Sequence, residues 1–251
     1  MVAGPGEPRG ASPEEPWFIE RCKTAPFDFA HDEKMATLST QALRVLFNLN
    51  DGRLTFQDAG GTTLHSESDR EPRRYDRVEV NGEKLYRVSE RLSLDAHQAL
   101  YGLGQHQSGV FNYRGTVVEL AQANADISLP LLISSNGSAI LWNTASRSQF
   151  DDRFPPELKL TADAADAIDY YFLYGPEMDS LIHQYRDLTG HAPLFGKWAY
   201  DSSNQRIVTS PPKNCWMSRP NIARSTCLLT LSCRIGFGGS ARAIRSIRKS
   251  T

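Results

Sequence analysis

Short runs of alternating apolar and polar residues fill much of the chain and are separated by small polar turn residues. Three turn pairs stand between such runs: Asp51-Gly52, Asn81-Gly82 and Asn136-Gly137. Asn-Gly and Asp-Gly pairs tolerate the positive φ angles of primed turns, which match the twist of antiparallel strands. The pattern therefore predicts three β-hairpins: 42–48 with 54–56, 75–80 with 84–88, and 131–133 with 139–142.

The run at 129–133 is continuously apolar, which is typical of a strand covered on both faces. A further strand is predicted over 167–174. The next segment has helical periodicity, with Pro176 in the first turn and Gly190 at the end. Its apolar positions are Met178, Leu181, Ile182, Tyr185 and Leu188. The predicted fold class is mainly β: an antiparallel β-sandwich with one helix near its end.

Composition divides the chain into three parts. Residues 1–16 hold Gly, Pro, Glu and Ser with almost nothing to bury, so we expect a disordered lead-in. Residues 17–195 carry the sandwich pattern. Residues 196–251 have no comparable pattern and are predicted to be a linker and a disordered tail.

The formal net charge of -1 is the sum of two unlike parts. Residues 1–200 carry 28 acidic and 19 basic side chains, whereas residues 201–251 carry one acidic and nine basic side chains.

No stretch approaches the ~18 apolar residues of a membrane span, and residues 1–10 lack the charged and apolar regions of an export signal. The sequence therefore predicts no membrane partner, and a cytoplasmic chain as written.

Gly102-Leu103-Gly104, followed by Gly109, superficially resembles a dinucleotide-binding loop. Position 107 is Gln, however, and no helical pattern or βαβ unit surrounds the motif. We expect these glycines to mark tight packing or a bend in a strand. No cofactor is predicted.

Neither a catalytic carboxylate pair nor a metal site is indicated by spacing. Asp151 and Asp152 are adjacent, and neighbouring residues on a strand point to opposite faces. The other acidic candidates, Asp163, Asp166 and Asp169, are expected to be solvated. The histidines His97, His106, His183 and His191 form no i, i+4 pair and have no Cys partner, and the cysteines lack CxxC spacing.

The basic tail has one Phe, one Trp and no Tyr to stack bases, so no nucleic-acid partner is predicted.

Several motifs together resemble the N-terminal domain of glycoside hydrolase family 31, in the manner of its α-xylosidases and α-glucosidases. They are the segments 101–109 (YGLGQHQSG), 112–115 (NYRG), 130–137 (PLLISSNG), 141–143 (LWN), 174–176 (YGP) and 193–200 (PLFGKWAY). The resemblance implies a galactose-mutarotase-like sandwich that would normally pack on its own catalytic (β/α)8 barrel. It covers about residues 41–200.

The family pattern stops at Tyr200, where a segment Gly-Phe-x-Gln-Ser-Lys-Asp-Arg-Tyr would be expected. Codons can be chosen for Asp201 to Thr209 such that the same bases, read in a frame shifted by one base, encode Phe-Ile-Gln-Ser-Lys-Asp-Arg-Tyr. The sequence thus predicts that residues 201–251 are barrel coding sequence translated out of frame, and that the positive charge of this segment is a by-product of the shifted reading frame.

The resemblance implies a retaining α-glycosidase whose two catalytic carboxylates belong to the barrel. No residue of this chain matches either of them, so the chain is predicted to be inactive alone. A sandwich loop, 120–126, would help to shape the sugar subsite. Asn124 takes the place of a substrate-contacting Asp, with Gln122 and Asp126 beside it. The alternative is a free-standing carbohydrate-binding or interaction module.

Overall fold

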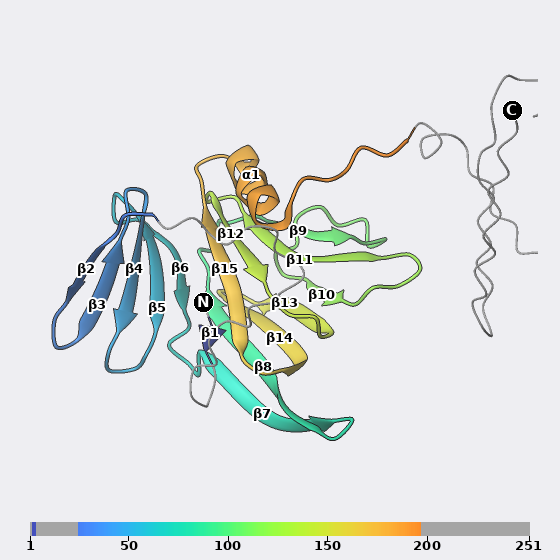
Figure 1. Cartoon of the computed structure of the whole chain (residues 1–251), viewed down its shortest axis with the longest axis horizontal. Helices are drawn as coiled ribbons and strands as arrows, with labels where there is room; N and C mark the ends of the chain where they lie inside the picture. Colours follow the sequence, from blue (N-terminus) through green and yellow to red (C-terminus); the bar gives the residue numbers. More distant parts are fainter. Residues whose placement is uncertain (1, 4–24, 197–251) are drawn as a thin grey trace, which may run out of the picture. The chain divides into compact units, whose positions relative to one another are not determined.

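The computed structural model describes Val2–Ala3 and residues 25–196, which form two antiparallel sheets and one helix (Figure 1). The five-stranded sheet has the order β1 (Val2–Ala3), β15 (Ile168–Tyr174), β12 (Ser138–Trp142), β11 (Ile127–Ser134), β9 (Leu100–Gln105). Most of the predicted lead-in, and all of the residues 201–251 that are predicted to be read out of frame, lie outside the described residues. Within the lead-in, Val2 and Ala3 depart from the prediction, because they pair with Asp169 and Ile168 of β15.

The ten-stranded sheet is built around a long central strand, β8 (Glu83–Ser93). On one side of β8 the order continues through β14 (Glu157–Ala165), β13 (Ser148–Phe154) and β10 (Val117–Leu120). On the other side β7 (Arg73–Val80) pairs with most of β8, and β6 (Thr63–Glu67) pairs with its end. The sheet then continues through β5 (Leu54–Asp58), β4 (Leu43–Asn48), β3 (Met35–Ser39) and β2 (Asp28–His31).

All three predicted hairpins are present, as β4–β5, β7–β8 and β11–β12. Asn81 and Gly82 form a two-residue turn in which both φ angles are positive, at 52° and 85°. The prediction of primed turns is wrong for the other two. In the β11–β12 hairpin only Gly137 has a positive φ, because Ser134 pairs with Ser138 and leaves three loop residues. Longer loops need just one left-handed residue.

The main core lies between the two sheets. Phe56 of β5 stacks on Phe172 of β15 with ring centroids 4.1 Å apart. Around them, the largest fully buried side chains in this core include Phe150, Leu92, Leu100, Leu103 and Leu158.

A second core covers the outer face of the five-stranded sheet, and α1 (Met178–Thr189) packs there. Leu131 and Ile133 face this core while Leu132 faces the main one, which confirms the prediction that 129–133 is covered on both faces. The helix ends at Gly190, as predicted. Pro176, however, lies just before the N-cap Glu177 and not in the first turn.

The Gly102-Leu103-Gly104 segment lies in β9 and has positive φ angles at all three residues (97°, 60° and 98°). This backbone turns Leu103 into the core, where it is 1% exposed. A Cβ atom at Gly104 would lie 1.9 Å from the carbonyl oxygen of Ile127. The glycines therefore allow the close approach of β9 and β11, which confirms the structural interpretation of this motif.

The helix of the described residues is not long and apolar enough to cross a bilayer.

Candidate functional site

Two loops at one end of the sandwich lie beside the residues predicted to contact sugar. One loop, 106–116, joins β9 to β10, and the other, 121–126, joins β10 to β11. Gln105 on β9 pairs with Ile127 on β11. Because these strands are antiparallel, the first residue of one loop, His106, is the cross-strand neighbour of the last residue of the other, Asp126.

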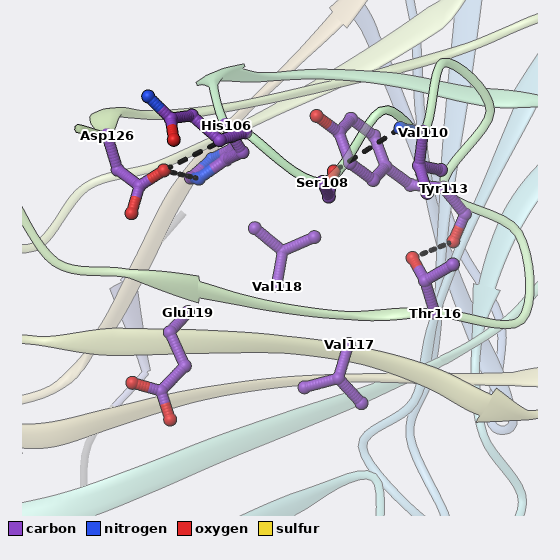
Figure 2. Close-up of a pocket in the computed structure, with 10 residues that line it drawn as sticks. His106, Ser108, Val110, Tyr113, Thr116, Val117, Val118, Glu119 and Asp126 are labelled. Carbon is purple, nitrogen blue, oxygen red and sulfur yellow. Dashed lines mark hydrogen bonds and ion pairs between the residues drawn. The ribbon is translucent and has the colours of Figure 1, made fainter.

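A groove of about 390 Å³ lies between these loops and β10 (Figure 2). Its lining consists of His106, Gln107, Ser108, Val110, Tyr113, Thr116, Val117, Val118, Glu119 and Asp126. Of the three predicted sugar-contacting residues, only Asp126 lines the groove. Asn124 and Gln122 are exposed outside it. The three residues therefore lie on one loop but do not line one cavity.

Two of the three predicted residues hold the loop itself. The Gln122 side-chain oxygen accepts a hydrogen bond of 3.0 Å from the Ser128 backbone amide. The carbonyl oxygen of Asp126 accepts one of 3.3 Å from the Ala123 amide. Asn124 lies between these anchors. The Asn124 side chain is exposed to solvent, and the loop is held by Gln122 and Asp126 instead.

His106 connects the two loops. Its Nε2 atom lies 2.9 Å from the Leu103 carbonyl oxygen, and its Nδ1 atom lies 3.7 Å from Asp126 Oδ1. The same carboxylate oxygen accepts a hydrogen bond of 3.4 Å from the Gln107 amide. The edge of the imidazole ring packs against Tyr113, with centroids 6.4 Å apart. Figure 2 shows His106 and Asp126 side by side at one end of the groove.

The loop 106–116 is fixed to both sheets. The Tyr113 ring is buried, and its amide donates a 2.8 Å hydrogen bond to the Leu100 carbonyl. Asp152 of β13 is fully buried and accepts hydrogen bonds from Arg114 Nη1 (3.0 Å) and the Gly115 amide (2.7 Å). Burial raises the pKa of Asp152, and the hydrogen bond from the Gly115 amide and then the Arg114 charge oppose that rise. One wall of the groove is thus rigidly held.

Two carboxylates, those of Glu119 and Asp126, line the groove. Its two carboxylates are both engaged, because Glu119 pairs with Arg147 and Asp126 faces His106. A glycosidase needs two carboxyl groups on opposite sides of a bound sugar ring. Within Val2–Ala3 and residues 25–196, no group of three or more His, Cys, Asp or Glu is placed to hold a metal ion.

The acidic residues considered from the sequence have structural partners. Asp151 pairs with Arg153 at 2.8 Å, and hydrogen bonding from Arg153 lowers the pKa of Asp151. Its neighbour Asp152 is buried, which confirms that the two point to different environments. Asp163 lies 3.6 Å from Arg87.

A buried cluster of ionisable residues, Glu67–Arg73–Glu90, was missed from the sequence. Arg73 donates to both carboxylate oxygens of Glu67, at 2.5 and 2.7 Å, and its Nε lies 3.8 Å from Glu90. Burial, and then the adjacent Glu67, raise the pKa of Glu90 well above its usual range. The available signal was the alternation of β8, where Glu90 occupies an inward position between Val88 and Leu92. The two carboxyl groups of the cluster are closed to solvent, since Glu67 and Glu90 are 2% and 0% exposed, whereas the Arg73 side chain is 20% exposed.

Comparisons with known proteins agree with the fold. Residues 6–151 match the family described as the glycosyl hydrolase 31 N-terminal galactose mutarotase-like domain. An alpha-xylosidase of Saccharolobus solfataricus is 34% identical over 174 residues, which are 65% of this chain and 23% of that protein. An isomaltosyltransferase of Sporosarcina globispora is 26% identical over 185 residues, 65% of this chain and 16% of that protein.

Solved structures show the same architecture. The GH31 alpha-xylosidase of Xanthomonas citri aligns with a TM-score of 0.68 at 18% identity, over 73% of this chain and 36% of that one. A GH31 alpha-xylosidase from a soil metagenome, complexed with xylose, aligns with a TM-score of 0.66 at 21% identity, over 76% and 30%. At these identities the likeness shows the fold alone. The chain spans less than a quarter of the length of the two sequence relatives above.

Proposed function

The chain belongs to glycosyl hydrolase family 31 through its N-terminal galactose mutarotase-like domain, and from this membership we propose that it serves as the accessory sandwich of a retaining α-glycosidase acting on α-xylosides or α-glucosides. The observation that carries the proposal is the family match over residues 6–151, joined to 34% identity with an alpha-xylosidase. In the complete enzyme the sandwich would pack on a catalytic barrel and add a loop to the sugar subsite.

The loop 121–126 supports this role. It is anchored at Gln122 and Asp126 and presents Asn124 to solvent between them. An amide side chain both donates and accepts hydrogen bonds, which suits recognition of sugar hydroxyls. In this proposal Asn124 contacts the substrate, while Gln122 and Asp126 keep the loop in place.

A polypeptide of residues 1–251, by itself, is proposed to be catalytically inactive. Glu67 and Glu90, two neighbouring carboxyl groups, are buried inside the sandwich and both contact Arg73. The test is release of p-nitrophenol from p-nitrophenyl α-xyloside and α-glucoside by the purified chain. We expect no turnover above an empty-vector preparation, and turnover that follows the protein through purification would refute inactivity.

The frame change after Tyr200 remains a proposal about the gene. Residues 201–251 lie outside the described residues, so its support is that synonymous codons can be chosen for Asp201 to Thr209 that encode the family pattern when shifted by one base. Sequencing the coding DNA across codons 198–205 tests it. A missing base there is expected, and an intact frame with unrelated downstream sequence would refute it.

A free-standing carbohydrate-binding module is the second candidate, and the groove beside Asp126 is the feature that favours it. Titration calorimetry of the purified chain with xylose, glucose and xyloglucan oligosaccharides separates the two. Saturable binding that is lost in Asp126→Ala, which changes a lining residue of the groove, supports a module that works alone. Absence of heat supports an accessory domain that needs its barrel, because a ligand pocket requires converging walls.

A further inference from the structure

We propose that the chain associates with a second copy of itself through the apolar face of β2, β3 and β4, which stays exposed beyond the edge of the five-stranded sheet. The contact is two-fold symmetric, and each copy supplies the layer that the sandwich of the other lacks. It goes beyond the proposed function and does not rest on it, because it uses neither the groove nor the loop 121–126.

Strand pairing divides the sheet from β2 to β5 into an apolar face and a polar face. Residues directly opposite each other in antiparallel strands lie on the same face, and successive residues along a strand alternate between faces. On the apolar face two cross-strand rows contain no Asp, Glu, Lys or Arg: Phe29–Leu38–Val45–Phe56 and His31–Ala36–Phe47–Leu54. On the polar face the rows are Asp28–Ser39–Arg44–Gln57 and Ala30–Thr37–Leu46–Thr55. This pattern is typical of an antiparallel sheet that buries one face against a second layer.

The second layer ends before the apolar face does. Phe56 of β5 is 4% exposed, because it stacks on Phe172 of β15. Along the same row Val45 is partly buried, Leu38 is 37% exposed and Phe29 is 60% exposed. Beyond β15 the five-stranded sheet holds only the two residues of β1 in the part of the chain that the structure describes. The main core therefore continues onto β4, β3 and β2 as an uncovered surface, and Figure 1 shows these strands extending past β15.

The uncovered surface is large enough for a weak interface. Phe47 of β4 is exposed on it, and Phe27 and Leu49, which directly precede β2 and follow β4, are exposed as well. With Phe29 and Leu38 these residues present about 500 Å² of surface, the size of patch that is often functional. Two such faces would bury about 1,000 Å² together, which is at the lower limit of specific interfaces. We therefore expect a reversible dimer with a dissociation constant of about 1 to 100 µM.

A second copy fits this face for two reasons. The two apolar rows carry no Asp, Glu, Lys or Arg, so a two-fold contact between them opposes no like charges. Sheet faces with apolar side chains are also the surfaces that pack on one another in β-sandwiches. The helix α1, after which the chain continues, packs instead on the outer face of the five-stranded sheet.

Sedimentation equilibrium of the full 251-residue chain, from about 2 to about 200 µM, tests the proposal. We expect the mass to rise with concentration from one chain towards two. Phe29→Glu should raise the dissociation constant at least about tenfold, because it places a charge inside the apolar contact. Ala30→Glu is the matched control, since Ala30 is the next residue of β2, is exposed and lies on the polar face. It should leave the dissociation constant unchanged.

Hydrogen–deuterium exchange over the same concentrations locates the contact. Peptides that cover β2–β4 should gain protection as the concentration rises, and a peptide from β13 should not. Circular dichroism confirms that both variants are folded. A chain that stays monomeric throughout, whatever else covers the face, overturns the proposal. Equal weakening by Phe29→Glu and Ala30→Glu would indicate pairing of β2 edges and would also overturn it, as would assembly beyond two chains.

Discussion

His65 Nε2 lies 2.7 Å from Ser138 Oγ, and this hydrogen bond joins β6 of the ten-stranded sheet to β12 of the five-stranded sheet. Ser138 Oγ also donates to Asn136 Oδ1 at 2.5 Å. Because the serine hydrogen is used there, His65 must donate through Nε2, and its Nδ1 is left unprotonated. That atom is buried and has no partner among the described residues. The pair is therefore a structural link between sheets and not a nucleophile with its base.

Acid should destabilise the sandwich through His65. Burial lowers the pKa of His65 to about 4, from about 6.5 in the unfolded chain. Between these values the unfolded state binds the proton and the folded state does not, so stability falls as the pH falls through this window. The full loss is about 3 kcal/mol. Urea unfolding at about pH 7 and about pH 4.5 measures it.

The matched substitutions are His65→Gln and His183→Gln. His65→Gln removes the titrating group, so it should unfold more easily at neutral pH but lose less stability on acidification. His183 is exposed on α1, and its substitution should leave the acid sensitivity unchanged. An acid response that is equal in all three chains would show that other groups cause it.

Glu90→Gln should stabilise the protein in alkaline solution. Burial raises the pKa of Glu90, so the folded state keeps a proton that the unfolded state releases above about pH 4.5. Stability consequently declines as the pH rises above that value. An uncharged isostere removes this penalty, and we expect the free energy of unfolding at about pH 8 to rise by about 1–3 kcal/mol.

Arg73→Gln provides the contrast for the same cluster. It strips Glu67 of a two-point partner while leaving that carboxylate 2% exposed, which should cost about 3–5 kcal/mol. Denaturant unfolding across the pH range measures the free energy of unfolding of both variants. If Glu90→Gln destabilised the fold as Arg73→Gln does, Glu90 would be ionised and paired in the native state.

Gly104→Ala should severely disrupt the domain. At φ +98° the new Cβ would lie 1.9 Å from the Ile127 carbonyl oxygen, so β9 and β11 would have to separate. Gly115→Ala is the matched control, because its φ is also positive (+72°) but nothing lies within 4 Å. We expect a cost of about 1 kcal/mol at Gly115 and more than about 4 kcal/mol at Gly104. Comparable thermal unfolding temperatures for the two variants would contradict this account.

The sheet architecture could be predicted from local pattern because turn chemistry and alternation act over a few residues. Asn81-Gly82 placed the β7–β8 hairpin correctly, and the apolar run 129–133 correctly indicated coverage on both faces. The exact turn types were less accessible, since the loop length after Ser134 depends on which residues pair across the hairpin.

The candidate site was less predictable, because it depends on register between distant segments. Asn124, Gln122 and Asp126 were placed on one loop by their neighbours in sequence. The partnership of Asp126 with His106, 20 positions earlier, follows from the β9–β11 pairing and from no local spacing. The buried cluster at Glu90 was hidden for the same reason, since its neighbour Arg73 is contributed by the adjacent strand β7.

Leu181→Ala should weaken the attachment of α1 far more than Ile182→Ala, although the residues are adjacent. Leu181 is 1% exposed and packs in the second core with Leu131 and Leu173, whereas Ile182 is 39% exposed. Truncating a fully buried leucine costs about 2–5 kcal/mol, because a cavity is left behind. The exposed isoleucine should cost less than about 1 kcal/mol. Denaturant unfolding, with hydrogen exchange of the helix amides, measures both; equal losses would mean that α1 contributes no packing energy of its own to the five-stranded sheet.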